Sequence, residues 1–269
     1  MTGSVADADD ICQDAWIRWR SLDRTTTVDN PEAYLVRVVT HLAIDRARAS
    51  SRRRETYVGP YLPEPIVSPV HENPSEVAEL ADSLMFAFLI MLDELDPIER
   101  AVLLFHDVFG YTFDEVGRAT DREGAAARKI ASRARRRLHE ARPHTMRVSD
   151  DRERALLRAF VTATVAGDVD ALMTLLAPDI IQVDDTGGTR PAARRPVVGA
   201  ERVSRVLINL ARRTSSSTRA DLVRVNASLG LLLRTDGKPD LVLVFGFSAD
   251  NRIQRIWIQA NPTKLTHVH

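Results

Sequence analysis

The sequence has one cysteine, no long apolar run and few histidines, and each scarcity excludes a class of protein. Because Cys12 stands alone, no disulfide can form within the chain, and nothing indicates an oxidising compartment. The longest apolar run, residues 84–92, is about half of the roughly twenty residues that a membrane-spanning helix needs. Acidic residues stand near the amino terminus, where a signal peptide carries cations. We therefore expect a cytoplasmic protein without a membrane segment.

Metal sites and repeat architectures also lack support. The seven histidines are scattered along the 269 residues without the spacing of metal ligands, and we find no internal repeat or low-complexity tract. We accordingly expect no metal and no cofactor. A content of 44% hydrophobic and 28% charged residues is typical of a globular chain with about two domains or slightly more.

Charge is distributed very unevenly, although the formal net charge is zero. Residues 37–54 contain six arginines and one acid, Asp45, and residues 118–147 are strongly basic again. Between Arg54 and Arg100 there is no lysine or arginine, while acids accumulate. Two basic patches joined by an acidic spacer favour a protein that holds one polyanion at two points.

Residues 111–138 have the pattern of a helix-turn-helix. From Gly124 onward, small and apolar residues recur at three- and four-residue spacing: Ala127, Ala131, Ala134 and Leu138. The other faces of this helix carry Arg128, Lys129, Ser132, Arg133 and Arg136. Cations neutralise phosphates and arginine can bind a guanine edge, so this face suits the DNA major groove. A merely solvated basic surface remains the alternative.

The first half of the chain is predicted to be helical. We expect helices over residues 6–19 and 34–54, the second beginning at Asn30-Pro31 and packing through Leu35, Val38, Val39 and Leu42. Residues 55–73 are rich in proline and predict a linker, whose apolar residues indicate that it docks on a surface. Helices are expected again over residues 75–95 and 97–109, the latter capped by Asp96.

The second half mixes helices with strands. Residues 152–167, 168–176 and 201–214 are predicted to be helical, residues 180–184 a strand and residues 187–196 a loop. Consecutive strands are expected over residues 219–226, 228–235, 241–248 and 252–259. This order predicts a curved antiparallel sheet wrapped on helices. The whole chain is thus expected to be multidomain, with all-α domains followed by an α+β domain.

Several segments, in the same order along the chain, resemble the extracytoplasmic-function sigma factors. Residues 6–19 and 30–48 resemble domain two of that family, and residues 97–104 with the helix-turn-helix resemble domain four. Residues 57–65 (Tyr-Val-Gly-Pro-Tyr-Leu-Pro-Glu-Pro) and 261–265 (Asn-Pro-Thr-Lys-Leu) resemble the subgroup with a carboxyl-terminal SnoaL-like domain. The resemblance implies sigma domain two over residues 1–54, a linker over 55–74, sigma domain four over 75–147 and a SnoaL-like domain over 148–269.

The resemblance implies a bacterial transcription-initiation factor that binds core RNA polymerase and promoter DNA, and it implies roles for residues at matching positions. The polymerase-binding residues would be Asp10, Gln13, Asp14, Trp16 and Arg18. The residues near the melted minus-ten DNA would be Tyr34, Arg37, Asp45, Arg46 and Arg48, since aromatic stacking and cations suit single strands. The residues in the major groove at minus thirty-five would be Arg128, Lys129, Ser132 and Arg133.

We also expect the added domain to act in cis as a regulator, packing on the sigma domains or on the linker. The linker residues of this contact would be Tyr61, Leu62, Pro63, Glu64 and Pro65, and its domain residues would be Asp184, Asp185, Gly187, Gly188, Asn261 and Pro262. Aromatic and apolar side chains in the linker motivate this hypothesis. The alternative is that the added domain only stabilises the protein.

The chain departs from the family pattern in three places. It begins at Met1-Thr-Gly-Ser, so we expect domain two to lack its first helix. The usual turn glycine and capping residue of the helix-turn-helix are Asp121 and Glu123, and aspartate tolerates the left-handed conformation. The subgroup's glycine-rich Asp-Gly-Gly-Gly-Lys is reduced to Asp184-Asp-Thr-Gly-Gly-Thr189.

Two rival functions stay open at this point. A helix-turn-helix regulator acting without polymerase would bind duplex DNA by itself, usually as a dimer. SnoaL-like folds also include ketosteroid-isomerase-type enzymes, which need a buried acid or base facing an apolar cavity, with Asp184 and Asp185 as candidates. No Asp–His pair with suitable spacing is present, so we do not expect an enzyme. The sequence identifies no small ligand for the added domain.

Overall fold

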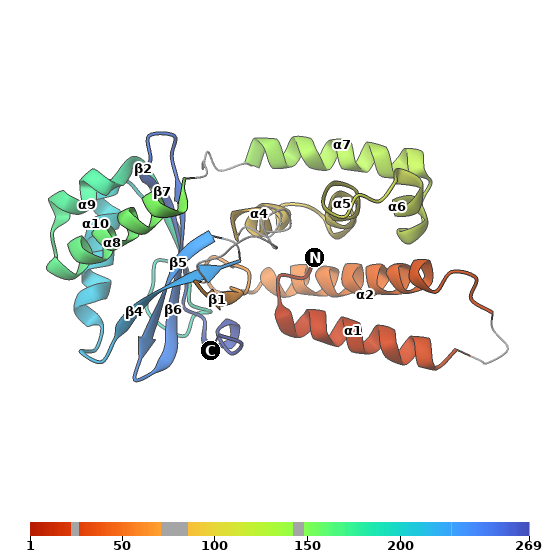
Figure 1. The fold of residues 1–269 in the computed structure, drawn as a ribbon, viewed down its shortest axis with the longest axis horizontal. Helices are drawn as coiled ribbons and strands as arrows, with labels where there is room; N and C mark the ends of the chain where they lie inside the picture. Colours follow the sequence, from red (N-terminus) through yellow and green to blue (C-terminus); the bar gives the residue numbers. More distant parts are fainter. Residues whose placement is uncertain (23–26, 71–85, 142–147, 227, 269) are drawn as a thin grey trace. The chain divides into compact units, whose positions relative to one another are not determined.

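The computed structural model describes residues 1–22, 27–70, 86–141, 148–226 and 228–268 (Figure 1). The chain divides into two compact units. The first unit combines residues 1–56 with 88–142, and the second combines residues 57–87 with 143–269. The predicted order, helical domains first and a mixed helix-and-sheet domain after them, is confirmed.

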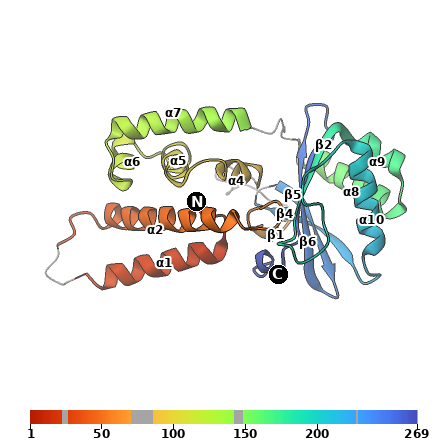
Figure 2. The same ribbon diagram turned by 180° about the vertical axis from the view of Figure 1, so that it is seen from behind.

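In the first unit, α1 (Val5–Arg20) packs against α2 (Pro31–Arg54), and the two helices lie side by side in Figures 1 and 2. The Asn30 side chain accepts a hydrogen bond from the Ala33 backbone N–H at 2.9 Å, and Pro31 occupies the first turn, so the predicted helix start is confirmed. Ile11 is buried on α1. The expected apolar stripe of α2 is only half-buried. The most buried residues of this helix are Thr40, Ala43, Ile44 and Ala47.

The other helices of the first unit are α4 (Phe86–Leu92), α5 (Pro97–Leu103), α6 (Phe113–Ala119) and α7 (Gly124–Ala141). Asp96 caps α5, as expected, and its capping box is completed by Glu99. The helix predicted over residues 97–109 is present, and its second half, Leu104–Val108, is a π-helix. The helix predicted over residues 75–95 lies outside the described residues before Phe86.

The second unit is built on one sheet with the strand order β1-β4-β5-β6-β7-β2-β3. Its strands are β1 (Val67–Pro69), β2 (Leu176–Asp185), β3 (Val197–Val198), β4 (Arg219–Val225), β5 (Ser228–Thr235), β6 (Lys238–Phe247) and β7 (Ile253–Gln259). The antiparallel meander from β4 to β7 is confirmed. The expectation of a purely antiparallel sheet is wrong, since β2 runs parallel to β7. The predicted linker contributes β1, which pairs Val67 with Val225.

Helices α8 (Asp150–Ala166), α9 (Val169–Leu175) and α10 (Ala200–Arg213) cover one face of this sheet (Figures 1 and 2). The core lies between them and includes Phe160, Leu207 and Ile256. Alternate residues of a strand point to opposite faces, so Asp184, which pairs with the core residue Ile258, shares the helix-covered face. Asp185 is opposite Gln259 and points to the other face. The parallel pairing therefore brings the carboxyl ends of β2 and β7 to the same edge.

Candidate functional site

The turn between α6 and α7 is tight, and its residues meet distinct steric demands. Asp121 has a φ of 54°, so the expectation that an aspartate takes the left-handed conformation usually given to glycine is confirmed. Gly117 on α6 must stay small, because a Cβ there would lie 2.7 Å from the Arg122 carbonyl oxygen. The turn thereby sets the direction in which α7 leaves α6.

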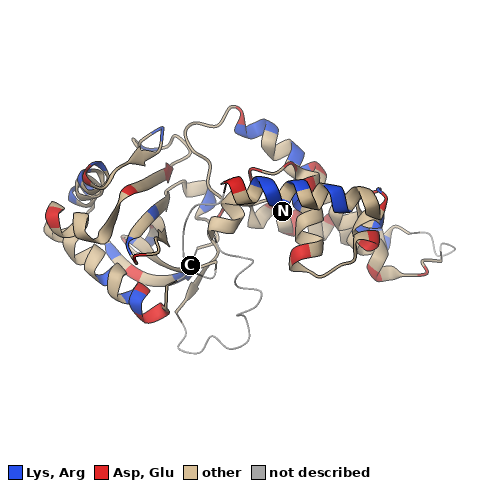
Figure 3. Cartoon of the chain, turned by 90° about the horizontal axis from the view of Figure 1, so that it is seen from above, with Lys and Arg blue, Asp and Glu red and all other residues tan. Residues whose placement is uncertain are grey.

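Helix α7 has the two faces that its sequence predicts. Ala127, Ala131 and Ala134 are fully buried, the first two against Val102 and Val116. The candidate base- and phosphate-binding residues are all exposed: Arg128, Lys129, Ser132 and Arg133. Lys and Arg residues follow much of this helix in Figure 3. Small buried side chains let the helix pack closely while its cations face solvent.

Not every cation of α7 is available for DNA. Arg135 binds both carboxylate oxygens of Asp107, at 2.9 and 2.5 Å, and this hydrogen bonding raises the pKa of its guanidinium. Arg137 donates to the buried carboxylate of Glu99 at 2.6 Å. These two arginines join α7 to the helices beneath it. Among the described residues, Arg133 has no such ion pair.

The candidate residues on α2 differ in what they contact. Arg46 lies 3.3 Å from Asp7 and donates to Asp10 at 3.1 Å, so it is tied to α1. Arg48 pairs with Asp45 at 3.1 Å on the surface. Arg37 donates to Asp121, at 2.7 Å.

Two large aromatic side chains of the candidate set differ in burial: Tyr34 makes a core contact and Trp16 is exposed. Tyr34 is half-buried, and its ring centroid lies 5.9 Å from that of Trp19, as expected of a core contact. Trp16 on α1 is 58% exposed, which is unusual for so large a side chain. The neighbouring candidate polymerase-binding residues are also exposed: Asp10, Gln13, Asp14 and Arg18.

In the second unit, the linker docks on a carboxylate that is fully buried. Asp185, 0% exposed, lies at the end of β2. Its Oδ1 accepts a hydrogen bond from the Tyr57 hydroxyl at 2.5 Å, and its Oδ2 accepts one from the Leu62 backbone N–H at 2.8 Å. Burial, followed by the hydrogen bond to Asp185, raises the pKa of Tyr57, so the phenol is the donor at neutral pH.

Residues at and after the end of β7 complete this contact. We name the whole contact the linker clamp, and its residues are Tyr57, Leu62, Asp185, Gln259, Asn261 and Lys264. Lys264 Nζ lies 2.7 Å from Asp185 Oδ2, donates to the Leu62 carbonyl at 2.6 Å and stands 3.2 Å from the Tyr61 ring centroid. The Gln259 amide donates to the carbonyls of Leu62 and Pro63. The Asn261 amide donates to the Tyr57 hydroxyl at 2.8 Å. A buried charge is thus balanced by an opposite charge and further donors, as burial requires.

The predicted regulatory residues divide between this clamp and its surroundings. Gly187 donates its N–H to Asp185 Oδ1 at 3.1 Å, and the Gly188 backbone lies against Val58 of the linker. Pro63 and Pro65 are buried, while Pro262 begins the short 3-10 turn that carries Lys264. Tyr57 and Lys264 lie within the segments that resemble the subgroup but are not among the residues predicted to make the contact, and no sequence signal indicates Gln259.

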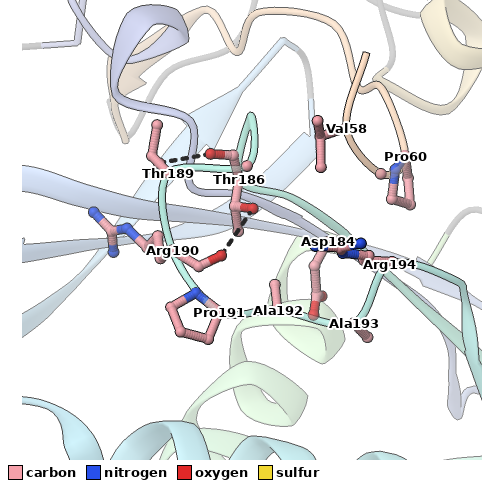
Figure 4. Close-up of a pocket in the computed structure, with 12 residues that line it drawn as sticks. Val58, Pro60, Asp184, Thr186, Thr189, Arg190, Pro191, Ala192, Ala193 and Arg194 are labelled. Atoms are coloured by element: carbon pink, nitrogen blue, oxygen red, sulfur yellow. Dashed lines mark hydrogen bonds between the residues drawn. The ribbon is translucent and has the colours of Figure 1, made fainter. Parts of the chain in front are cut away.

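A cavity of about 320 Å³ lies beside the clamp, between the linker and the loop after β2 (Figure 4). Its lining combines small apolar residues with polar ones: Val58, Gly59, Pro60, Asp184, Thr186, Gly188, Thr189, Arg190, Pro191, Ala192, Ala193 and Arg194. Burial raises the pKa of Asp184, whose Oδ1 accepts a hydrogen bond from the Gln182 amide at 2.8 Å. Asp185, the other candidate acid, is fully engaged by the clamp.

Comparison with known proteins defines the class first. Residues 1–53 match the family described as Sigma-70 region 2, and residues 86–138 match Sigma-70, region 4. The chain is 35% identical to the ECF RNA polymerase sigma factor SigJ of Mycobacterium tuberculosis over 99% of its own length and 88% of that protein. It therefore belongs to the extracytoplasmic-function family of RNA polymerase sigma factors, which bind core RNA polymerase and direct it to promoters.

A solved structure agrees with this family. The crystal structure of Mycobacterium tuberculosis SigJ is similar with a TM-score of 0.73 and 32% identity, covering 98% of this chain and 91% of that one. A SnoaL-like protein from Burkholderia thailandensis covers 43% of this chain and 98% of its own, with 15% identity and a TM-score of 0.34. The rival reading of a regulator that acts without polymerase is not favoured. In the described part of the chain, no helix is long and apolar enough to cross a membrane.

Proposed function

We propose that residues 1–54 and 75–147 carry the polymerase and promoter contacts, and that residues 148–269 regulate them through the linker of residues 55–74. Arg128, Lys129, Ser132 and Arg133 are assigned to the major groove at minus thirty-five, because they are all exposed on the solvent side of α7 and can donate hydrogen bonds to bases or phosphates. Tyr34, Arg37, Arg46 and Arg48 are assigned to the minus-ten region.

The polymerase contact is assigned to α1. Its residues Asp10, Gln13, Asp14, Trp16 and Arg18 are all exposed, and the opposite face of the helix packs on α2 through Ile11 and Ala15. An exposed tryptophan flanked by charged residues has the composition of a protein interface. The assigned face of α1 is therefore the face that does not pack on α2.

Regulation in cis is supported by one observation: Asp185, a fully buried carboxylate of the added domain, accepts hydrogen bonds from the Tyr57 hydroxyl and the Leu62 backbone N–H of the linker. Linker residues with the proposed regulatory role are Tyr61, Leu62, Pro63, Glu64 and Pro65, and the domain residues are Asp184, Asp185, Gly187, Gly188, Asn261 and Pro262. A docked linker has fewer accessible conformations than a free one. We infer that docking restrains the two sigma regions that the linker joins, and that its release favours polymerase engagement.

The added domain is assigned no catalytic step. No enzyme family is indicated by the comparisons, Asp185 is held by Lys264 and Tyr57, and Asp184 lies in a cavity that also contains Arg190 and Arg194 rather than a purely apolar one. An isomerase base needs a free carboxylate against an apolar substrate site. We place the protein in the bacterial cytoplasm, where its polymerase is located.

Run-off transcription with purified core polymerase tests this function. The full chain is expected to support promoter-dependent transcription, and Tyr57→Phe, which removes two hydrogen bonds of the linker clamp, is expected to raise it about two- to tenfold, since each net hydrogen bond contributes about 1 kcal/mol. Thr174→Ala provides the control, because Thr174 is exposed on α9, lies outside the clamp and donates to a carbonyl of its own helix. Transcription equal for Tyr57→Phe and its control would refute regulation through the linker.

A further inference from the structure

Two segments that are 84 residues apart meet through one carboxylate in the first unit. Asp121 Oδ1 accepts a hydrogen bond from Arg37 Nη2 at 2.7 Å, and Asp121 Oδ2 lies 3.2 Å from His41 Nε2. Arg37 and His41 are four residues apart on α2, so they share one helix face. Asp121 is the left-handed residue of the helix-turn-helix turn. The acid therefore joins α2 to the turn that orients α7.

The contact lies beside an open groove. This groove, of about 740 Å³, lies between the beginning of α2 and α6 with its following turn. Its walls include Tyr34, Arg37, Tyr111, Arg118 and Arg122. Asp121 therefore joins α2 to the turn at a place that solvent reaches.

A different kind of contact holds the other end of α2. Asp93 lies 3.0 Å from Arg54 and 2.9 Å from Arg100, and the side chain of Arg100 is only 4% exposed. Arg100 also donates to the Met1 carbonyl at 2.5 Å. Removing one member of such a buried cluster leaves charges uncompensated, so this end resists opening. By contrast, the side chains of Arg37 and Asp121 are 59% and 49% exposed.

We propose that Asp121 is a releasable latch that holds the beginning of α2 against the helix-turn-helix in the free protein and occupies Arg37 until a promoter phosphate replaces it. The part that concerns DNA rests on the proposed function, which assigns Arg37 to the minus-ten region. The latch itself does not, because it is a contact within the free chain.

The exposure of Arg37 and Asp121 determines how strongly the latch can favour the closed molecule. Exposed ion pairs contribute little, so loss of the latch is expected to change the ratio of open to closed molecules by about two- to fivefold. Such a contact is screened as salt increases, since the Debye length falls from about 8 Å at 0.15 M to about 3 Å at 1 M. A DNA phosphate presents the same kind of anion to Arg37 and releases counterions as it binds. A phosphate therefore readily replaces the Asp121 carboxylate, whose ion pair with Arg37 is weak.

The native cysteine provides a labelling site for measuring the distance between the pair of helices α1 and α2 and helix α7. Cys12 is exposed on α1 and is the only cysteine, and His139 is exposed near the end of α7. His139→Cys gives a second site, and single-molecule energy transfer between dyes at these positions reports opening of the full chain without DNA. Asp121→Asn preserves the shape of the side chain, and asparagine tolerates the left-handed backbone conformation. Asp121→Gly removes the steric cost of that conformation entirely.

Both substitutions at Asp121 are expected to raise the population with low energy transfer about two- to fivefold at low salt and to flatten its dependence on NaCl. Glu123→Gln is the matched control, because it removes the same charge from the same turn, and Glu123 has no ion pair with α2 among the described residues. Arg37→Gln should open the molecule similarly, and the double variant should add little, as a double-mutant cycle requires for a direct pair.

The proposal is overturned if Asp121→Asn and Asp121→Gly behave like Glu123→Gln, or if the effects of Arg37→Gln and Asp121→Asn simply add. Circular dichroism establishes that each variant is folded. Run-off transcription separates this result from the proposed function: a closed population that depends on Asp121 in a chain that gives no transcript would refute the function and support the latch.

Discussion

The two ion pairs on which the proposals depend, one in each unit, differ in burial. In the first unit, the side chains of Arg37 and Asp121 are 59% and 49% exposed. In the second unit, the decisive pair is Asp185 with Lys264, whose side chains are 0% and 7% exposed. Exposed pairs exchange easily with external anions, whereas a buried pair is broken only at a high cost.

This difference matches the role that we propose for each pair. An arginine that binds a promoter must leave its internal partner when a phosphate arrives, so weak pairing suits Arg37. A linker that must stay docked needs a contact that solvent does not compete for, as at Asp185.

The largest expected effect comes from the buried pair. Asp185→Asn would leave the Lys264 ammonium without its counter-charge, which we expect to lower the free energy of unfolding by about 3–5 kcal/mol. Urea denaturation measures this change. Asp179→Asn, an exposed position on the same strand, should stay within about 0.5 kcal/mol of the parent. Equal losses for the two variants would remove the contrast between buried and exposed charges.

The next effect concerns free and paired cations on α7. Arg133→Ala should weaken binding of the polymerase complex to promoter DNA by about 1–3 kcal/mol if the side chain forks onto a base. If it contacts a phosphate instead, the dependence of log K on log salt should fall by about 0.9. Arg135→Ala is the matched control, because Arg135 is held by Asp107. Filter binding over a salt series checks both, and a larger loss for Arg135→Ala would contradict the assignment.

The smallest expected effect is a pH dependence of stability caused by Asp184, which, among the described residues, has no counter-charge like that of its neighbour Asp185. Burial raises the pKa of Asp184 above that of an unfolded aspartate, about 3.9, so the folded protein retains this proton over a pH window in which the unfolded chain has lost it. The resulting stability is present below that window and is lost as pH rises through the folded pKa. Asp184→Asn should remove this dependence and raise Tm at pH 7 but not at pH 3. Thermal melts across pH measure it, and parallel curves for the two proteins would exclude the effect.

The helices could be predicted well because their signals are local. The alanine stripe of α7 and the Asn30-Pro31 start of α2 specify one face and one boundary within a few residues. The strands β4 to β7 follow one another with short turns, so each finds its neighbour along the chain. Asp121 was also predictable, since few residues other than glycine accept a positive φ.

The remaining features depend on contacts between distant residues. The three residues of β1 form a strand because β4 offers them an edge, and no periodicity can be read from so short a segment in a proline-rich linker. The parallel pairing of β2 with β7 likewise follows from how the helices fill the core, not from either strand. Gln259 has no distinguishing neighbours in sequence, and its role appears only once the linker carbonyls lie above it.

The parallel pairing of β2 with β7 also has a consequence for the order of events during synthesis. The linker clamp joins Leu62 to Lys264, a residue that is 202 positions later in the chain. At about 5–20 residues per second, a ribosome needs on the order of ten seconds or more to cover that distance. Both sigma regions therefore emerge while the linker still has no partner. A nascent chain therefore passes through an unclamped stage before this contact can form.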